Sequence, residues 1–273
     1  MSETLAEAWA GTWTGRAPTD LYREDVLYWP IEDPPTAAGL GVDAVLAYVD
    51  RFRSSVETPT VDVYRTFGST REVVIEAIIS GVDATDDGER KGTGVCAILD
   101  LDEDGLVSRE QIHMQWRGRR PDTGDLRPKI PAQDGVDRGD EFWRDFAHRQ
   151  LDPWGSPAAD PDGMVDAVYA EEGYVLDSMI GKQSVRLDGR EALRAAEHQL
   201  LERLPIRETY IARIVHGGNA AAVWHPVIGR KSPSASAPLS AFSSLMVLTV
   251  NADGRCISEH TYLPAAWPPA SSS

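Results

Sequence analysis

Residues 167–177 read AVYAEEGYVLD, and residues 20–30 read DLYREDVLYWP, so that Tyr169 aligns with Tyr22 at an offset of 147 residues. Three later pairs of segments keep nearly the same register, at offsets of 148, 148 and 149 residues: 41–52 with 189–200, 71–81 with 219–229, and 100–114 with 249–263. Four aligned segments in one order are typical of an internal repeat. The chain of 273 residues is therefore predicted to contain two copies of one domain.

Each copy has the same expected order of elements. A first helix leads to a short helix that contains the aligned tyrosine and feeds a strand, and an amphipathic helix follows with apolar residues at helical spacing. Segments rich in β-forming residues come next, joined by hairpin turns such as DEDG at 102–105. Helices followed by a meander predict an α+β fold, here two tandem cone-shaped domains. Each cone would pack about three helices on a strongly curved mixed or antiparallel sheet.

The expected boundaries follow from composition. Residues 1–118 form the first cone and residues 139–268 the second. Between them, 119–138 is polar, rich in Pro and Gly and without periodicity, as expected of a linker. Residues 269–273 are expected to be a disordered tail.

The charge and the cysteines limit the partners. A net charge of −16 argues against nucleic acid and against anionic membranes as partners. No stretch is apolar enough for a membrane span, and the first residues do not resemble a signal peptide. Two cysteines without metal-ligand spacing favour buried thiols over a disulfide, and we expect a cytoplasmic protein without metal or cofactor.

Several short motifs resemble the nuclear transport factor two-like superfamily, which includes ketosteroid isomerases, SnoaL-like polyketide cyclases and polyether epoxide hydrolases. The motifs are Tyr-Ala-Glu-Glu at 169–172, Asp177, Gly-Arg-Glu at 189–191, and Asp-Gly-Arg at 253–255 with Tyr262. The first copy matches more loosely. The resemblance implies the cone fold for both copies, and a pair of cones packed as a pseudo-dimer, with the chain a monomer or a homodimer. It does not by itself fix the chemistry.

Carried over residue by residue, the resemblance gives a mixed result. Asp177 falls where ketosteroid isomerases place the general base, and Pro30 occupies that position in the first copy. The buried acid of the isomerase oxyanion hole is replaced by Ala97 and Met246. Fused polyether epoxide hydrolases use a pair of carboxylates, and Glu208 lies roughly where they carry the second one.

Strand alternation predicts which polar side chains point inward. Glu110 shares its parity with Ile112, Met114 and Trp116, and Glu259 shares its parity with Ile257, Thr261 and Leu263. Burial raises the pKa of a carboxyl group with few partners, which suits a general acid. The alternative is a carboxylate paired with an arginine.

Three further residues are candidates for the site. His225 shares the parity of the apolar residues of its strand, although a satisfied core histidine is the alternative. Glu197 replaces the apolar Val49 on a helix stripe, where it looks into the cavity or flanks the stripe. Asp33 could supply the base that the first copy lacks, unless its Pro-rich loop is only a solvated turn.

Aromatic residues are expected to line each cone, some as core and some as pocket wall. The candidates for the pocket are Trp9, Tyr28, Tyr64, Trp116, Tyr174 and Tyr262.

The leading hypothesis is a cofactor-independent enzyme that acts on an apolar, polyketide- or polyether-like small molecule by general acid/base chemistry between carboxylates. Epoxide opening with cyclisation is its most specific version, and isomerase or dehydratase activity is an alternative. A non-catalytic binding or scaffolding protein of the same fold is the rival from another class. The two copies differ in their polar residues, so one copy could only scaffold the other.

Overall fold

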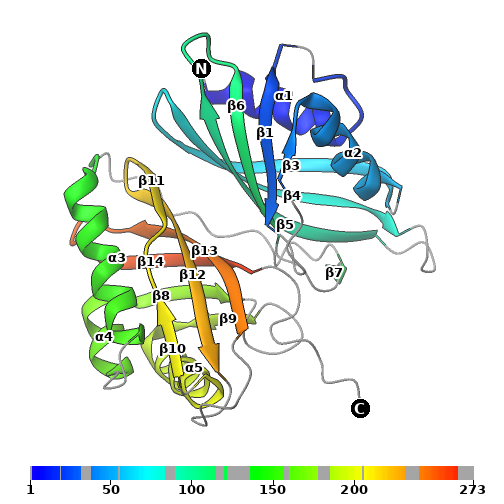
Figure 1. The fold of residues 1–273 in the computed structure, drawn as a ribbon. Coiled ribbons are helices and arrows are strands. Elements are labelled where there is room, and N and C mark those ends of the chain that lie inside the picture. The colour runs from blue at the N-terminus through cyan, green and yellow to red at the C-terminus, as the bar shows by residue number, and fades with distance from the viewer. Residues whose placement is uncertain are drawn as a thin grey trace. The chain divides into compact units, whose positions relative to one another are not determined.

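The computed structural model describes residues 2–18, 20–31, 38–54, 56–83, 90–114, 120–121, 136–155, 160–177, 185–204, 206–230 and 240–263. The chain divides into two compact units, residues 1–127 and 128–273. Figure 1 shows a mixture of helices and a broad sheet in each unit.

Unit 1 carries its helices on one face of a seven-stranded sheet. Its elements are α1 (Ser2–Trp13), β1 (Tyr22–Ile31), β2 (Gly39–Leu40), α2 (Val42–Arg53), β3 (Val56–Gly68), β4 (Glu72–Asp83), β5 (Arg90–Leu101), β6 (Val107–Met114) and β7 (Arg120–Pro121). The strand order is β2-β1-β6-β5-β4-β3, with β7 beside β5. Strand β1 runs parallel to β6, and the other pairs are antiparallel.

Unit 2 repeats this plan with a second seven-stranded sheet. Its elements are α3 (Asp140–Gly155), α4 (Pro161–Val168), β8 (Tyr169–Asp177), β9 (Val185–Asp188), α5 (Gly189–Arg203), β10 (Ile206–Thr209), β11 (Arg213–Gly217), β12 (Ala220–Arg230), β13 (Ser240–Val250) and β14 (Cys256–Tyr262). The order is β10-β12-β13-β14-β8-β9, with β11 beside β12 and one parallel pair, β8 with β14. The prediction of a duplicated α+β fold with a mixed sheet is confirmed.

The helix count differs from the expectation in unit 1. Within the described residues, unit 2 has three helices and unit 1 has two. Eight residues separate Trp13 from Tyr22, whereas fourteen separate Trp154 from Tyr169, and the longer connection holds α4. The aligned tyrosines also do not lie in a short helix, because each is the first residue of a strand.

The repeat extends to a β-bulge in the last hairpin of each unit. Between β5 and β6, Asp100 faces Arg109 and Leu101 faces Val107, so that one residue of β6 is extra. The same shift occurs between β13 and β14, where Ile257 is the extra residue. Ile257 was predicted to point inward with Glu259. Because of the bulge, Cys256 joins the core in its place and Ile257 stays half-buried.

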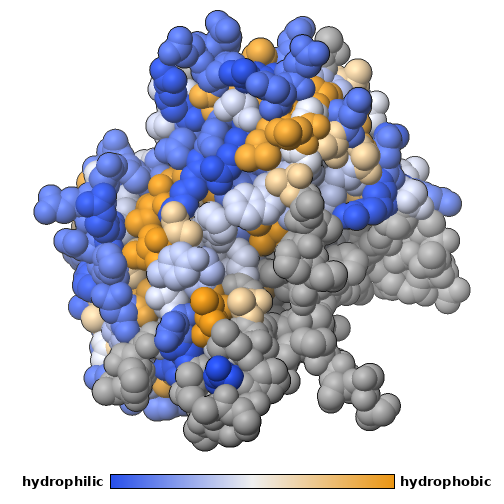
Figure 2. Space-filling model, viewed as in Figure 1, coloured by the Kyte–Doolittle hydropathy of each residue, from blue (hydrophilic) through white to orange (hydrophobic). Residues whose placement is uncertain are grey.

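The surface of unit 2 follows the amphipathic pattern of α3. Trp143, Phe146 and Ala147 are buried against the sheet. The charged residues of α3, including Glu141, Arg144 and Asp145, are exposed, and Figure 2 shows this helix as a hydrophilic edge of the unit. Residues 136–138, at the end of the expected linker, belong to unit 2, where Arg138 donates to the carbonyls of Asn251 and Ala252.

Candidate functional site

Glu110 of β6 is a buried carboxyl group with two strong donors. Its oxygens accept hydrogen bonds from Trp9 Nε1 at 2.8 Å and from the Tyr22 hydroxyl at 2.6 Å, and its side chain is almost wholly shielded from solvent. Burial raises the pKa of Glu110 to about 7, although the bonds from Trp9 and Tyr22 oppose this rise. Glu110 therefore titrates near neutrality inside unit 1.

Glu259 occupies the equivalent place in β14 of unit 2. Its Oε2 atom accepts from the Tyr169 hydroxyl at 2.5 Å and from Gln150 Nε2 at 2.7 Å, and its Oε1 atom accepts from the Thr261 hydroxyl at 3.2 Å. Burial raises the pKa of Glu259, and the three hydrogen bonds oppose the rise. The bond from tyrosine to glutamate is thus common to both repeats, since Tyr22 aligns with Tyr169.

The donors to Glu259 locate the proton of its neutral form. Burial, followed by the charge of Glu259, raises the pKa of Tyr169 well above its ordinary value, so Tyr169 keeps its proton and donates it. Gln150 can only donate through Nε2. Both lone pairs of Oε2 are therefore engaged, and the acid proton of a neutral Glu259 belongs on Oε1, the oxygen next to Thr261.

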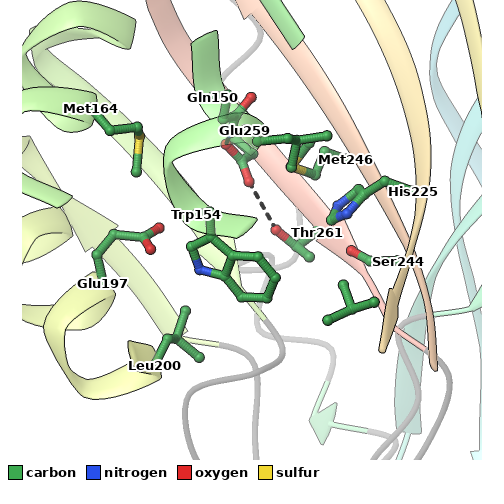
Figure 3. Close-up of a pocket in the computed structure, with 12 residues that line it drawn as sticks. Gln150, Trp154, Met164, Glu197, Leu200, His225, Ser244, Met246, Glu259 and Thr261 are labelled. Carbon is green, nitrogen blue, oxygen red and sulfur yellow. Dashed lines mark hydrogen bonds between the residues drawn. The ribbon is translucent and has the colours of Figure 1, made fainter. Parts of the chain in front are cut away.

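A cavity of about 50 Å³ opens beside Glu259 in unit 2. Figure 3 shows the wall residues converging on it from α3, α4, α5 and the sheet. Its polar wall consists of Gln150, Glu197, His225, Ser244, Glu259 and Thr261. The volume suits one or two water molecules or a few ligand atoms, and it is far below the several hundred Å³ of a site that encloses a drug-sized ligand.

His225 of β12 lines this cavity and has a bare ring nitrogen, that is, one with neither a proton nor a hydrogen-bond partner. The Thr209 hydroxyl donates its single proton to the carbonyl of Pro226 at 2.9 Å, and it lies 3.0 Å from His225 Nδ1. Nδ1 must therefore carry the ring proton and donate to Thr209, which leaves Nε2 as an acceptor. Nε2 is buried and has no hydrogen-bond partner. Burial lowers the pKa of His225 to about 3, so the ring is neutral at physiological pH.

The polar wall of unit 2 is apolar in unit 1. The strand registers establish the equivalence, because Ala77 faces Val95 as His225 faces Ser244, and Ala97 faces Ile112 as Met246 faces Thr261. The equivalent pairs, unit 2 first, are Glu197 and Val49, His225 and Ala77, Ser244 and Val95, Thr261 and Ile112. Gln150 is matched by Trp9, since each donates to the glutamate of its own unit. The repeat glutamate is thus retained in both units, but only unit 2 surrounds it with polar groups.

Aromatic rings occupy the interior of unit 1. The centroid of Trp13 lies 6.0 Å from Trp9, 6.1 Å from Tyr48 and 5.4 Å from Phe52, and Tyr28 lies 5.3 Å from Tyr48. Trp9, Trp13 and Tyr28 are all buried. Of the aromatic lining expected in this unit, Trp9 and Tyr28 therefore belong to the core.

Several predicted site residues lie elsewhere. Glu208 is exposed on β10, because its neighbours Arg207 and Thr209 take the inward positions. Tyr174 and Tyr262 lie on the other face of the sheet, with His260 between them at centroid distances of 6.3 and 6.4 Å.

The remaining predictions are only partly described. Tyr64 is half-buried at a register shift of β3. Asp177 ends β8, and only its place in the strand is described. Asp33 and Trp116 lie outside the described residues.

The site includes residues that were not predicted from the sequence, among them Gln150, Thr209 and Tyr169. Tyr169 anchored the alignment of the repeats, and its match with Tyr22 was the available signal. Gln150 and Thr209 gave no such signal, because their roles depend on side-chain hydrogen bonds that no sequence pattern marks.

No family model matches the sequence, and no curated protein matches it either. Solved structures do match in fold. A SnoaL-like protein of unknown function from Burkholderia thailandensis E264 is 20% identical, covers 47% of this chain and 99% of its own, with a TM-score of 0.37. A protein with a ketosteroid isomerase-like fold from Catenulispora acidiphila is 13% identical, with 44% and 85% coverage and a TM-score of 0.38.

An NTF2-like protein of unknown function from Exiguobacterium sp. 255-15 is 15% identical, with 44% and 99% coverage and a TM-score of 0.36. These are SnoaL-like and NTF2-like folds. Each covers about half of this chain, and at these identities the likeness is one of fold alone.

The described part of the chain contains no group of three or more His, Cys, Asp or Glu residues that could hold a metal ion. It likewise contains no helix that combines the length and the apolar composition needed to cross a membrane.

Proposed function

We propose that unit 2 is a small-molecule enzyme in which Glu259 acts as a general acid, and that unit 1 is its scaffold. The observation that carries this proposal is the asymmetry of the two interiors. Unit 2 places a carboxyl of raised pKa and the bare Nε2 of His225 around one cavity, whereas unit 1 has an alanine in place of the histidine. Polar groups gathered around a buried acid of raised pKa favour function over packing.

The reaction that suits these groups is the opening of an epoxide. Glu259 Oε1 gives its proton to the epoxide oxygen as the carbon–oxygen bond breaks, and the oxygen of a water or substrate hydroxyl forms the new bond to carbon. His225 Nε2 takes the proton that this nucleophile loses. A return of that proton to Glu259, directly or through water, restores the starting state and leaves a diol or a cyclic ether as product.

The cavity also sets a limit on the substrate. Its volume of about 50 Å³ holds the reacting oxygen atoms and their immediate neighbours. Only the reacting end of a polyketide- or polyether-like substrate would enter it, while the apolar remainder stays outside.

The test is to measure the turnover of a panel of small epoxides as the rate of diol formation. We expect Glu259→Gln to lower the rate by about 10²- to 10⁴-fold, since the amide cannot donate an acid proton. The matched control is Glu110→Gln, the same change at the repeat-equivalent core position, which should leave turnover unchanged in a folded protein. Equal losses in both variants would contradict the assignment to unit 2.

A second pair of variants identifies the base. His225→Gln should also lower the rate, whereas Glu197→Gln should have a much smaller effect. The reverse result would assign the base to Glu197 and restore the pair of carboxylates expected from the sequence. Binding of epoxides without turnover by the unaltered protein would favour the non-catalytic alternative.

A cytoplasmic location, the domain boundaries and the pseudo-dimer stay predictions.

A further inference from the structure

Arg207 of β10 is a buried cation, and two of its three guanidinium nitrogens have no hydrogen-bond partner. The residue is 8% exposed, and its Nη1 donates to the carbonyl of Leu204 at 3.0 Å. Nε and Nη2 are both buried and have no hydrogen-bond partner. Burial lowers the pKa of Arg207 from its ordinary value, and the charge of Glu197 opposes this effect. Leaving two donors of a buried guanidinium unpaired is costly, so the arrangement needs an explanation.

The unused atoms form one edge of the guanidinium group. Elsewhere in this chain the same edge binds a carboxylate. Arg23 donates from Nε and Nη2 to the two oxygens of Asp25, at 2.8 and 3.0 Å. Arg186 uses the same edge on Asp188: Nε and Nη2 both donate to Oδ1, at 2.9 and 2.8 Å, and Nε also lies 3.1 Å from Oδ2. The spacing of these two N–H groups matches that of the two oxygens of a carboxylate.

Arg207 lies against the wall of the cavity in unit 2. It faces Gly229 across the sheet as Thr209 faces Val227, a cavity residue, so Arg207 belongs to the inward side of β10. Its guanidinium carbon lies 5.2 Å from the ring centroid of Trp154, and Trp154 lines the cavity. The guanidinium is therefore one aromatic ring away from the space bounded by Glu259 and His225.

We propose that the Nε and Nη2 edge of Arg207 binds the carboxylate of a small organic acid whose other end occupies the cavity of unit 2. The inference names the substrate class of the site and rests on the proposed function for its catalytic meaning. Two parallel N–H···O bonds would satisfy the buried donors, and the anion would neutralise the buried charge. Such a ligand combines a carboxylate with an oxygen that reaches Glu259 and His225.

The test measures binding by isothermal titration calorimetry, with acetate and propionate as probes and acetamide and propionamide as their neutral counterparts. We expect saturable binding of the acids, at least tenfold tighter than that of the amides. Arg207→Met should weaken acid binding at least tenfold. Arg207→Lys should also weaken it, because lysine keeps the charge but lacks the two-pronged edge. The control is Arg186→Met, which removes an exposed arginine of the same unit and should bind as the unaltered protein does.

Three results would overturn the proposal: equal binding of acids and amides, equal binding of propionate and chloride at one ionic strength, or unchanged propionate binding by a folded Arg207→Met protein. The first two need no variant, so they decide the matter even if both Arg207 variants fail to fold. Two measurements on the unaltered protein separate this inference from the proposed function. Tighter binding of propionate than of propionamide without epoxide turnover would contradict only the enzyme, whereas turnover of neutral epoxides with equal binding of acids and amides would contradict only this inference.

Discussion

Glu110 and Glu259 place the same buried residue type in two different environments within one chain. Both accept a hydrogen bond from the aligned tyrosine of their unit. Glu110 also accepts a hydrogen bond from the large apolar side chain of Trp9. Glu259 instead accepts hydrogen bonds from Gln150 and Thr261, and all three residues line a cavity. The polarity of the neighbours, and not the carboxyl itself, separates a core residue from a candidate acid.

The pH dependence of stability gives a prediction for Glu110. Its pKa is about 7 in the folded state and near its ordinary value of 4.5 in the unfolded state. Between these values the folded state holds the proton and the unfolded state does not. The stabilising contribution of the neutral carboxyl is therefore complete below about pH 4.5 and is lost as the pH rises through about 7. The loss amounts to about 3 kcal/mol in the free energy of unfolding.

Glu110→Gln should remove this loss. The measurement is urea unfolding of both proteins between pH 4.5 and 8, and the quantity to follow is their difference, because buried histidines such as His225 add an opposite dependence to both curves. We expect the difference to shift by about 3 kcal/mol in favour of the variant as the pH rises. Glu103→Gln, at an exposed turn, should run parallel to the unaltered protein. Parallel curves for Glu110→Gln would refute the raised pKa.

At the residue scale, sequence patterns predict the position of a side chain but not its hydrogen bonds. Alternation along the strands placed Glu110, Glu259 and His225 inward, where the structure has them. The same rule failed for Ile257, because a bulge shifts the parity and leaves no mark in the pattern. The bare Nε2 of His225 was beyond prediction, since it depends on the single proton of Thr209.

At the scale of elements, the two repeats differ most between the first helix and the first strand. Unit 2 has α4 there, and Asp160 caps its first turn by accepting from the amide of Gly163 at 2.9 Å, with Pro161 as the first helical residue. Unit 1 has six residues fewer in this connection. The alignment of the tyrosines matched the strands but concealed this difference, because it carried no information on the spacing before them.

The cap of α4 can be tested by a pair of substitutions. Asp160→Ala should lower the free energy of unfolding by about 1 kcal/mol, because the amide of Gly163 loses its acceptor. Asp160→Asn keeps an acceptor oxygen and should cost much less. Thermal and urea unfolding of the two variants provide the measurement. Met164 of α4 lines the cavity, so Asp160→Ala should also weaken the binding of propionate. Equal stability of the two variants would show that the cap contributes nothing.

Glycine marks the start of the long helix in both repeats and was visible in the sequence. Gly41 and Gly189 have φ values of 83° and 80°, a region that favours glycine. The chain turns there from the short edge strand into α2 or α5. This backbone requirement explains why the aligned segments 41–52 and 189–200 both open with glycine, whereas their later residues diverge.

At the scale of the whole molecule, the described residues combine an apolar, aromatic-rich interior in unit 1 with a polar-walled cavity in unit 2. Duplicated domains share a backbone plan, and an apolar residue at a wall position avoids the cost that a buried polar group imposes there. Unit 1 follows this course, with Val95 where unit 2 has Ser244 and Ile112 where it has Thr261. On the proposed function, the polar wall of unit 2 gives up stability in exchange for a site, a relation typical of enzymes.

Exchanging one residue between the repeats tests this relation. Ser244→Val brings the unit 1 residue into the cavity, and the added methyl groups should raise the free energy of unfolding by about 1 kcal/mol. The same change should abolish epoxide turnover and weaken propionate binding, because it occupies space beside His225 and Thr261. Val95→Ser is the reciprocal change in unit 1. It should lower stability by about 1 to 3 kcal/mol, since it buries a hydroxyl in an apolar core, and leave turnover unchanged. If Val95→Ser abolished turnover in a folded protein while Ser244→Val did not, the two units would have to exchange the roles assigned to them.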